Sequence, residues 1–82
     1  MNDFFVGQVT CYYEKIGFAA LQLEEPLTIG DPIYIRGEGI SLEQIVDSMR
    51  VGDEPIESGL PGESVCIRVV RKVCPGDRVY LE

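Results

Sequence analysis

The chain has 82 residues, of which 45% are hydrophobic and 26% charged, a composition typical of one small globular domain that spans residues 1–82. Fourteen Asp and Glu against seven Lys and Arg give a formal net charge of −7. This balance argues against a protein that binds nucleic acid or an anionic membrane through general attraction to phosphates. The apolar runs are too short to span a bilayer, so we expect no membrane partner.

The first residues of the chain and its cysteines bear on the cellular compartment in which the protein is expected. No basic segment precedes an apolar run, so the sequence predicts no signal peptide. Three cysteines without a Cys-x-x-Cys pair are typical of free thiols in a reducing compartment, and we expect a cytoplasmic protein. Cys74, close to Arg71 and Lys72 in the sequence, is the one candidate for a redox-active thiol.

Short segments in which apolar and polar residues alternate, separated by Gly and Pro, predict β-strands along the whole chain. In the first segment, residues 5–13, Val9, Cys11 and Tyr13 alternate with polar residues. A hairpin turn and a return strand follow, and Pro26 ends that strand because proline cannot donate a backbone hydrogen bond.

A glycine followed by an acidic residue recurs along the chain. The copies are GDPIYI at 30–35, GDRVYL at 76–81, Gly-Asp at 52–53 and Gly-Glu at 62–63. The glycine can adopt the positive φ of a tight turn, the acidic residue caps or solvates that turn, and a strand follows. We interpret each copy as the start of a strand. An anion-binding glycine loop is disfavoured, because the acidic neighbour would repel phosphate.

The segment from Ile40 to Val51 has two interpretations. Leu42, Ile45, Val46 and Met49 have helical spacing, which predicts a short amphipathic helix. A strand would need a bulge to place Val46 and Met49 on one face, since they are three residues apart. The local pattern favours the helix, whereas the resemblance described next favours the strand, which we expect.

Five segments, in this order, resemble the β-barrel domain that follows the GTPase domain in translation elongation factors such as elongation factor Tu. They are VGQV (6–9), LTIGDPIYI (27–35), QIVDSM (44–49), ESGLPGESVCI (57–67) and PGDRV (75–79). The chain is also similar to small stand-alone versions of this barrel and to barrels that end collagenase-like peptidases. The resemblance implies an all-β domain in which six or seven strands form a small closed barrel. It does not imply GTP hydrolysis or a free-nucleotide partner, because the chain has no Gly-x-x-x-x-Gly-Lys-Ser/Thr motif.

Strand alternation predicts which side chains form the core of this barrel, since every second residue of a strand points inward. The expected core is Val9, Ala19, Leu21, Leu23, Ile33, Ile35, Val46, Ile56, Val65, Ile67, Val69, Val79 and Leu81.

The sequence contains no recognisable catalytic or metal-binding set. It has no histidine, which excludes Ser–His and Cys–His pairs and most catalytic zinc sites. The acidic doublets Glu24-Glu25 and Asp53-Glu54 fall at expected strand ends, where a solvated turn is the ordinary interpretation. We therefore expect that the protein is not an enzyme and that it binds no cofactor and no metal ion.

Outward positions of the expected strands carry tyrosines and most of the cations. The candidate partner-binding residues are Tyr34, Arg36, Arg68, Arg71, Lys72, Arg78 and Tyr80. Tyrosine faces and arginine forks suit single-stranded RNA or a protein partner. They are also ordinary residues of a sheet surface, and the sequence does not decide whether they form one patch.

These observations predict a non-catalytic binding module. The resemblance implies a translation-associated context, with RNA, a ribonucleoprotein or a translation factor as partner. The alternative is an accessory protein–protein interaction subunit of an enzyme on a separate chain, for example a collagenase-like peptidase. The net charge of −7 favours a protein ligand over RNA.

Overall fold

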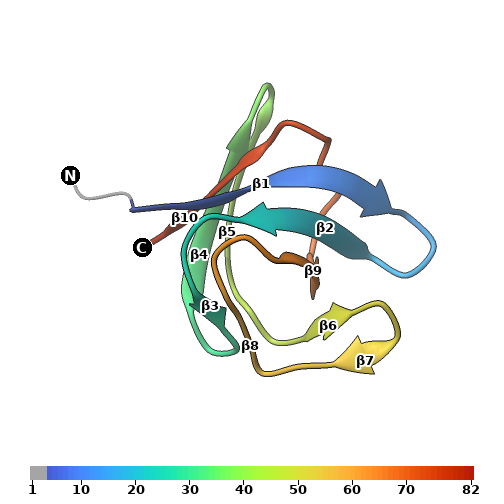
Figure 1. Ribbon diagram of the computed structural model, residues 1–82. Helices are drawn as coiled ribbons and strands as arrows, with labels where there is room; N and C mark the ends of the chain where they lie inside the picture. Colours follow the sequence, from blue (N-terminus) through green and yellow to red (C-terminus); the bar gives the residue numbers. More distant parts are fainter. Residues whose placement is uncertain (1–3) are drawn as a thin grey trace.

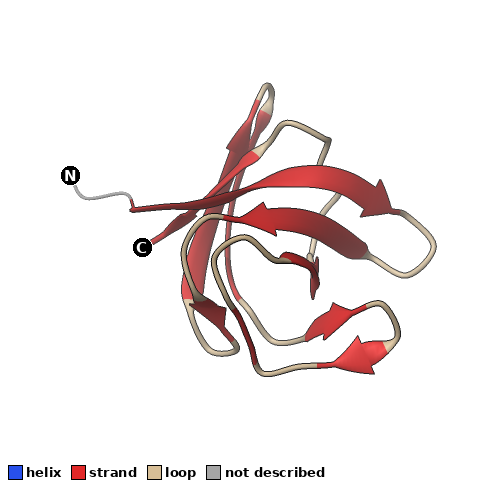
Figure 2. Ribbon diagram, viewed as in Figure 1, coloured by secondary structure: helices blue, strands red, loops and turns tan. Residues whose placement is uncertain are grey.

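The structure, a computed structural model, describes residues 4–82 as strands joined by turns and loops (Figures 1 and 2). The strands are β1 (Phe4–Tyr13), β2 (Phe18–Leu23), β3 (Leu27–Thr28), β4 (Pro32–Gly37), β5 (Ile40–Ile45), β6 (Met49–Val51), β7 (Glu54–Pro55), β8 (Ser58–Gly59), β9 (Ser64–Arg68) and β10 (Arg78–Leu81). Residues 4–82 contain no helix long and apolar enough to cross a membrane. The predicted all-β class is confirmed.

Eight of the strands form one antiparallel sheet in the order β5-β4-β10-β1-β2-β9-β6-β7, and β3 pairs separately with β8. The sheet curls around an apolar interior (Figure 1). Its backbone pairing stays open, because β5 and β7 stand at the two ends of the strand order. The expected closed barrel of six or seven strands is therefore not what the strand pairing forms.

A side chain bridges the point where backbone pairing stops. Gln44 of β5 donates through Nε2 to the Arg68 carbonyl at 2.8 Å, and its Oε1 accepts from the Val70 N–H at 3.0 Å. One side-chain amide thus offers the donor and the acceptor that a neighbouring strand would offer. It ties β5 to the last residue of β9 and to the chain that follows, without a continuous strand pair.

Strands β5 and β6 occupy the segment from Ile40 to Val51, so the strand interpretation is confirmed and the helical one is wrong. Leu42 in β5, Val46 between the strands and Met49 in β6 are all buried. The break between the two strands, rather than a bulge, brings Val46 and Met49 to one core. The helical spacing of the apolar residues is a consequence of that break.

The core closely follows the expected alternation. All of the expected residues are buried in one cluster, except Ile56 and Leu81, which are half-buried and pack against it. The same cluster contains residues that alternation did not identify: Val6, Leu27, Leu42, Met49 and Val73.

Irregularities in β1 explain one error of the alternation. Its register shifts against β10 near the start of the strand and against β2 between Val9 and Cys11. A bulge changes the face on which the following residues lie. Tyr12 therefore packs on the core and Tyr13 is exposed, so the expected common face of Val9, Cys11 and Tyr13 is wrong.

The glycine–acid pattern folds into the same four-residue turn at residues 28–31, 60–63 and 74–77. In each turn the N–H of the acidic fourth residue donates to the carbonyl of the first, at 3.0, 3.1 and 3.1 Å. The acidic side chain accepts from the N–H of that first residue, at 2.9, 2.8 and 2.9 Å. The glycine in third place has a φ of 100°, 89° and 97°, as a type II turn requires. The capping role is confirmed in these turns, whereas residues 52–53 form the two-residue turn between β6 and β7.

Asp77 differs from the other capping residues because it is buried, with 5% of its surface exposed. Its carbonyl accepts from the Val9 N–H at 2.8 Å, and the Gly76 N–H donates to the Val9 carbonyl at 2.8 Å. Its side chain lies so close to Gly37 that a Cβ at Gly37 would overlap the carboxylate. Asp77 thus connects β1 and β4 immediately before β10 begins.

Replacing Asp77 by Ala removes the acceptor of the Cys74 N–H and should lower the free energy of unfolding by about 1–3 kcal/mol. The control is Asp53→Ala: Asp53 is exposed, its side chain makes no hydrogen bond within residues 4–82, and a change of at most about 0.5 kcal/mol is expected. Urea unfolding curves measure both variants. Equal stability of the two would contradict the capping role of Asp77.

Replacing Ile67 by Ala should cost about 2–5 kcal/mol, because the side chain is fully buried in the core cluster. Ile45→Ala makes the same change at a side chain that is 59% exposed and should cost little. Thermal unfolding compares the two, and an unchanged melting temperature for Ile67→Ala would overturn its place in the core.

Candidate partner-binding surface

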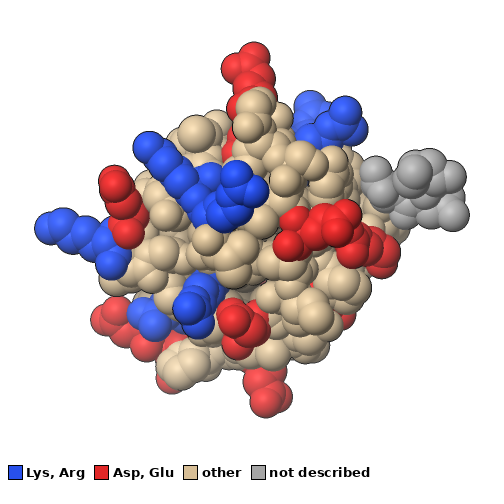
Figure 3. All heavy atoms as spheres, turned by 180° about the vertical axis from the view of Figure 1, so that it is seen from behind, with Lys and Arg blue, Asp and Glu red and all other residues tan. Residues whose placement is uncertain are grey.

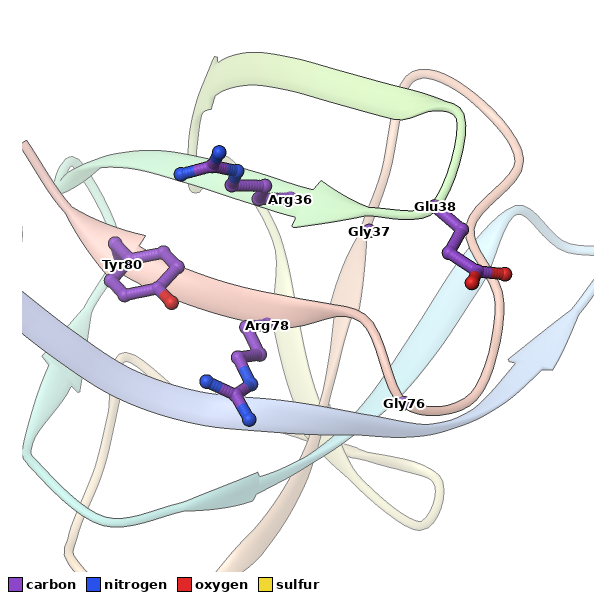
Figure 4. A pocket seen from close by; sticks show the side chains of 6 residues that line it. All are labelled: Arg36, Gly37, Glu38, Gly76, Arg78 and Tyr80. Carbon is purple, nitrogen blue, oxygen red and sulfur yellow. The ribbon is translucent and has the colours of Figure 1, made fainter.

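Four of the seven candidate residues lie together on two neighbouring strands. Tyr34 and Arg36 of β4 stand directly opposite Tyr80 and Arg78 of β10. Residues opposite each other in an antiparallel pair point to the same side of the sheet. Figure 4 shows Arg36, Arg78 and Tyr80 projecting from these strands on one side. With Phe5, which stands opposite Tyr80 on β1, they form what we call the aromatic–arginine face.

Three rings form a row across β1, β10 and β4. The Phe5 and Tyr80 rings meet edge to face, with centroids 5.7 Å apart and planes at 67°. The centroids of Tyr80 and Tyr34 are 6.4 Å apart, and the Tyr34 hydroxyl forms a hydrogen bond of 2.9 Å with the Ser41 hydroxyl of β5. Such contacts hold the rings in place and leave a preformed aromatic surface.

The two arginines form the neighbouring row and carry uncompensated charge. Both are exposed, and within residues 4–82 no ion pair joins either guanidinium to an acidic side chain. The residues that continue their row, Gln8 on β1 and Ser41 on β5, are uncharged. Like charges directly opposite in a sheet are destabilising. The sheet therefore holds two positive charges side by side without a counter-charge of its own.

A hollow of about 380 Å³ opens beside this row (Figure 4). It is lined by Arg36, Gly37, Glu38, Gly76, Arg78 and Tyr80. A second hollow of about 310 Å³ shares Gly37, Glu38 and Gly76, and continues along the Asp77 turn. Gly76 leaves open space beside the hollow, whereas the place of a Cβ at Gly37 is filled by the Asp77 carboxylate. The guanidinium groups and the Glu38 carboxylate give the hollow charges of both signs.

The other three candidates lie elsewhere. Arg68 ends β9, three strands away from β10 in the sheet order, and pairs with Asp47 at 3.8 Å, with both side chains largely exposed. Arg71 and Lys72 are exposed on the connection between β9 and β10. Figure 3 shows Lys and Arg interspersed with Asp and Glu over one side of the molecule, without a continuous basic surface.

The sequence did not identify Phe5 and Glu38 as neighbours of this face. Phe5 meets Tyr80 only through the register of β1 against β10, which shifts just after Phe5 and has no sequence signal. Glu38 could have been found, because its Gly-Glu-Gly turn directly follows Arg36 and joins two strands. A hairpin turn places its residues beside the ends of both strands.

The cysteines are free thiols. Cys11, Ala20, Cys66 and Arg50 occupy successive positions in one row across β1, β2, β9 and β6. Burial raises the pKa of the Cys66 thiol above its ordinary value, and Arg50 opposes this only in part. Cys66 is therefore protonated at neutral pH and a poor nucleophile. Within residues 4–82 no group of three His, Cys, Asp or Glu side chains is arranged to hold a metal ion.

No protein-family model matches the chain. It is 36% identical over 77 residues to an uncharacterised protease of Methanocaldococcus jannaschii, and 32% identical over 79 residues to a collagenase of Porphyromonas gingivalis. Each comparison covers 93% of this chain. The chain spans about a fifth of the length of these relatives, 19% of the first and 22% of the second.

A solved structure has the same fold. It is the C-terminal domain of a Geobacillus thermoleovorans protein assigned to the U32 peptidases, with a TM-score of 0.89, 23% sequence identity, and 96% of this chain and 92% of that chain covered. The resemblance to the elongation factor barrel is therefore wrong: the relatives are proteases, and the matching domain belongs to a peptidase. The translation-associated context and the ribonucleoprotein partner, which rested on that resemblance, are not supported.

Alkylation with iodoacetamide should separate the thiols. Cys74 is exposed and Cys66 is half-buried with a raised pKa, so Cys74 should react first near neutral pH. Because thiolate is the reactive form, the rate at Cys66 should reach half of its maximum at a pH above that of an unperturbed thiol. Mass spectrometry of timed digests measures both rates. Faster labelling of Cys66 at pH 7 would contradict this description.

Proposed function

We propose that this chain is a non-catalytic binding module that works with the catalytic region of a collagenase-like peptidase, on the same polypeptide or on a separate one. The observation that carries the proposal is sequence similarity over 93% of the chain to about a fifth of two proteases. About four fifths of each relative lies outside the matched part and is available for a catalytic region. The fold shared with a peptidase's C-terminal domain also supports a separate domain beside the catalytic region.

The chemistry of the residues supports a binding role over a catalytic one. The chain has no histidine. The hollow beside the arginine row offers two guanidinium groups, a tyrosine and the Glu38 carboxylate, without a nucleophile paired to a base. Peptide hydrolysis needs such a pair or an activated water. We expect the isolated chain to hydrolyse no peptide.

The aromatic–arginine face is the surface we assign to binding. Tyrosine and arginine are, with tryptophan, enriched among the residues that contribute most to protein–protein affinity. Both combine a large contact area with directional hydrogen bonds. Here the rings are already fixed by mutual contacts, so little side-chain freedom is lost on binding.

Capture from a lysate of the native organism tests the proposal. Tagged chain, treated with nuclease and washed at high salt, should retain a collagenase-like peptidase identified by mass spectrometry. Tyr80→Ala should weaken this capture, whereas Tyr13→Ala should not, because Tyr13 is exposed at the end of β1, away from the aromatic–arginine face. Melting curves of both variants control for folding. Peptide hydrolysis by the chain alone would contradict the proposal. So would a lysate in which no peptidase is retained and the chain's own polypeptide carries no peptidase region.

A further inference from the structure

Arg36 and Arg78 stand opposite each other, which is electrostatically unfavourable, and within residues 4–82 neither forms an ion pair. Their row continues into Gln8 and Ser41, neither of which carries charge. Fourteen acidic residues are present in the chain, yet in residues 4–82 the one ion pair joins Arg68 to Asp47. Two arginines on directly opposite residues, without an ion pair to an acidic side chain of residues 4–82, are suited to an anion that arrives from outside.

The arginines are also held in a fixed register. The Asp77 turn directly precedes β10, accepts from Val9 of β1, and packs its carboxylate against Gly37 at the end of β4. These contacts set β10 against β1 and β4, and so place Arg78 opposite Arg36. The two arginine side chains therefore start from adjacent, fixed backbone positions. Less conformational entropy is lost when they are ordered around a ligand.

We propose that this hollow binds a single carboxylate of a protein or peptide, an Asp or Glu side chain or a free carboxyl terminus, that has an apolar or aromatic side chain next to it. The inference rests on the proposed function in taking a protein as the ligand. Each guanidinium can offer two parallel N–H donors to a carboxylate. The neighbouring side chain packs on Tyr80, which lines the same hollow and belongs to the ring row.

Two carboxylates limit the ligand to one compact anionic group. Glu38 lines the hollow on one side, and Glu43 stands opposite Tyr34 at the end of the ring row. A chain of phosphates running along either direction would meet one of them. The net charge of −7 and the interspersed acidic groups add to that repulsion (Figure 3). A single carboxylate carries one negative charge and therefore meets less of this repulsion than a chain of phosphates does.

Titration followed by ¹⁵N–¹H NMR tests the inference in a chain of this size. The probes are acetyl-Phe-Glu-Phe-amide, its Gln analogue, inorganic phosphate and a tetramer of uridine nucleotides. The Glu peptide should shift the amide signals of β4 and β10, and should bind about tenfold or more tightly than the Gln peptide, because a charge-assisted pair is lost in the latter. Binding should weaken as salt rises.

The double variant Arg36→Gln/Arg78→Gln should lose the preference for Glu over Gln. The double variant Arg71→Gln/Lys72→Gln removes the same charge elsewhere on the chain and should keep it. Unchanged amide signals away from the substituted residues show that both variants are folded. Equal binding of the two peptides, signal shifts on other strands, or tighter binding of phosphate or of the uridine tetramer would overturn the inference.

This result is distinguishable from failure of the proposed function. If the arginine double variant still captures the peptidase and no peptide preference exists, the carboxylate inference falls alone. If the Glu peptide binds as expected and no peptidase is found, either captured or on the chain's own polypeptide, the proposed function falls and the carboxylate site stands.

Discussion

The buried carboxylate of Asp77 is the constraint on which the candidate surface depends. It caps its own turn at the Cys74 N–H, and its position is possible only because Gly37 has no Cβ. The turn is bonded to β1 through Val9, at the point where the register of β1 against β2 begins to shift. Three strands are thereby fixed where β10 starts, and the cross-strand pairs of tyrosines and arginines follow from that register. The stabilising turn and the candidate binding surface are in this way one piece of structure.

Local chemistry determined what could be predicted from the sequence. The glycine–acid turns could be recognised because a glycine, an acidic residue and an alternating segment follow one another in the sequence. Three of these copies fold into the same turn. The inward positions were recognisable because alternation is a property of the strand itself. The bulges of β1, the break between β5 and β6, and the Gln44 bridge were not, since each depends on a partner distant in the sequence. The spacing of the apolar residues around Met49 shows how a break between two strands can produce the sequence pattern of a helix.

The candidate surface was predictable in its residues and not in its arrangement. Alternation placed Tyr34 and Arg36 outward, as it did Arg78 and Tyr80, but the pairing of β4 with β10 joins segments more than forty residues apart. The same limit explains why Arg68 was grouped with them although β9 lies elsewhere in the sheet. The likeness to elongation factors rested on the order of strands and turns, which common turn chemistry produces in unrelated proteins. Sequence identity with proteases over nearly the whole chain is the more specific observation.

The central claim is that the partner contacts the aromatic–arginine face. Hydroxyl-radical footprinting tests it directly, because tyrosine is readily oxidised and the chain contains tyrosines both on and off this face. In the complex with the captured peptidase, oxidation of Tyr34 and Tyr80 should fall relative to the free chain, while Tyr13, at the far end of β1, should be oxidised equally in both states. Protection of Tyr13 with unchanged oxidation of Tyr34 and Tyr80 would place the partner on another face and contradict the claim.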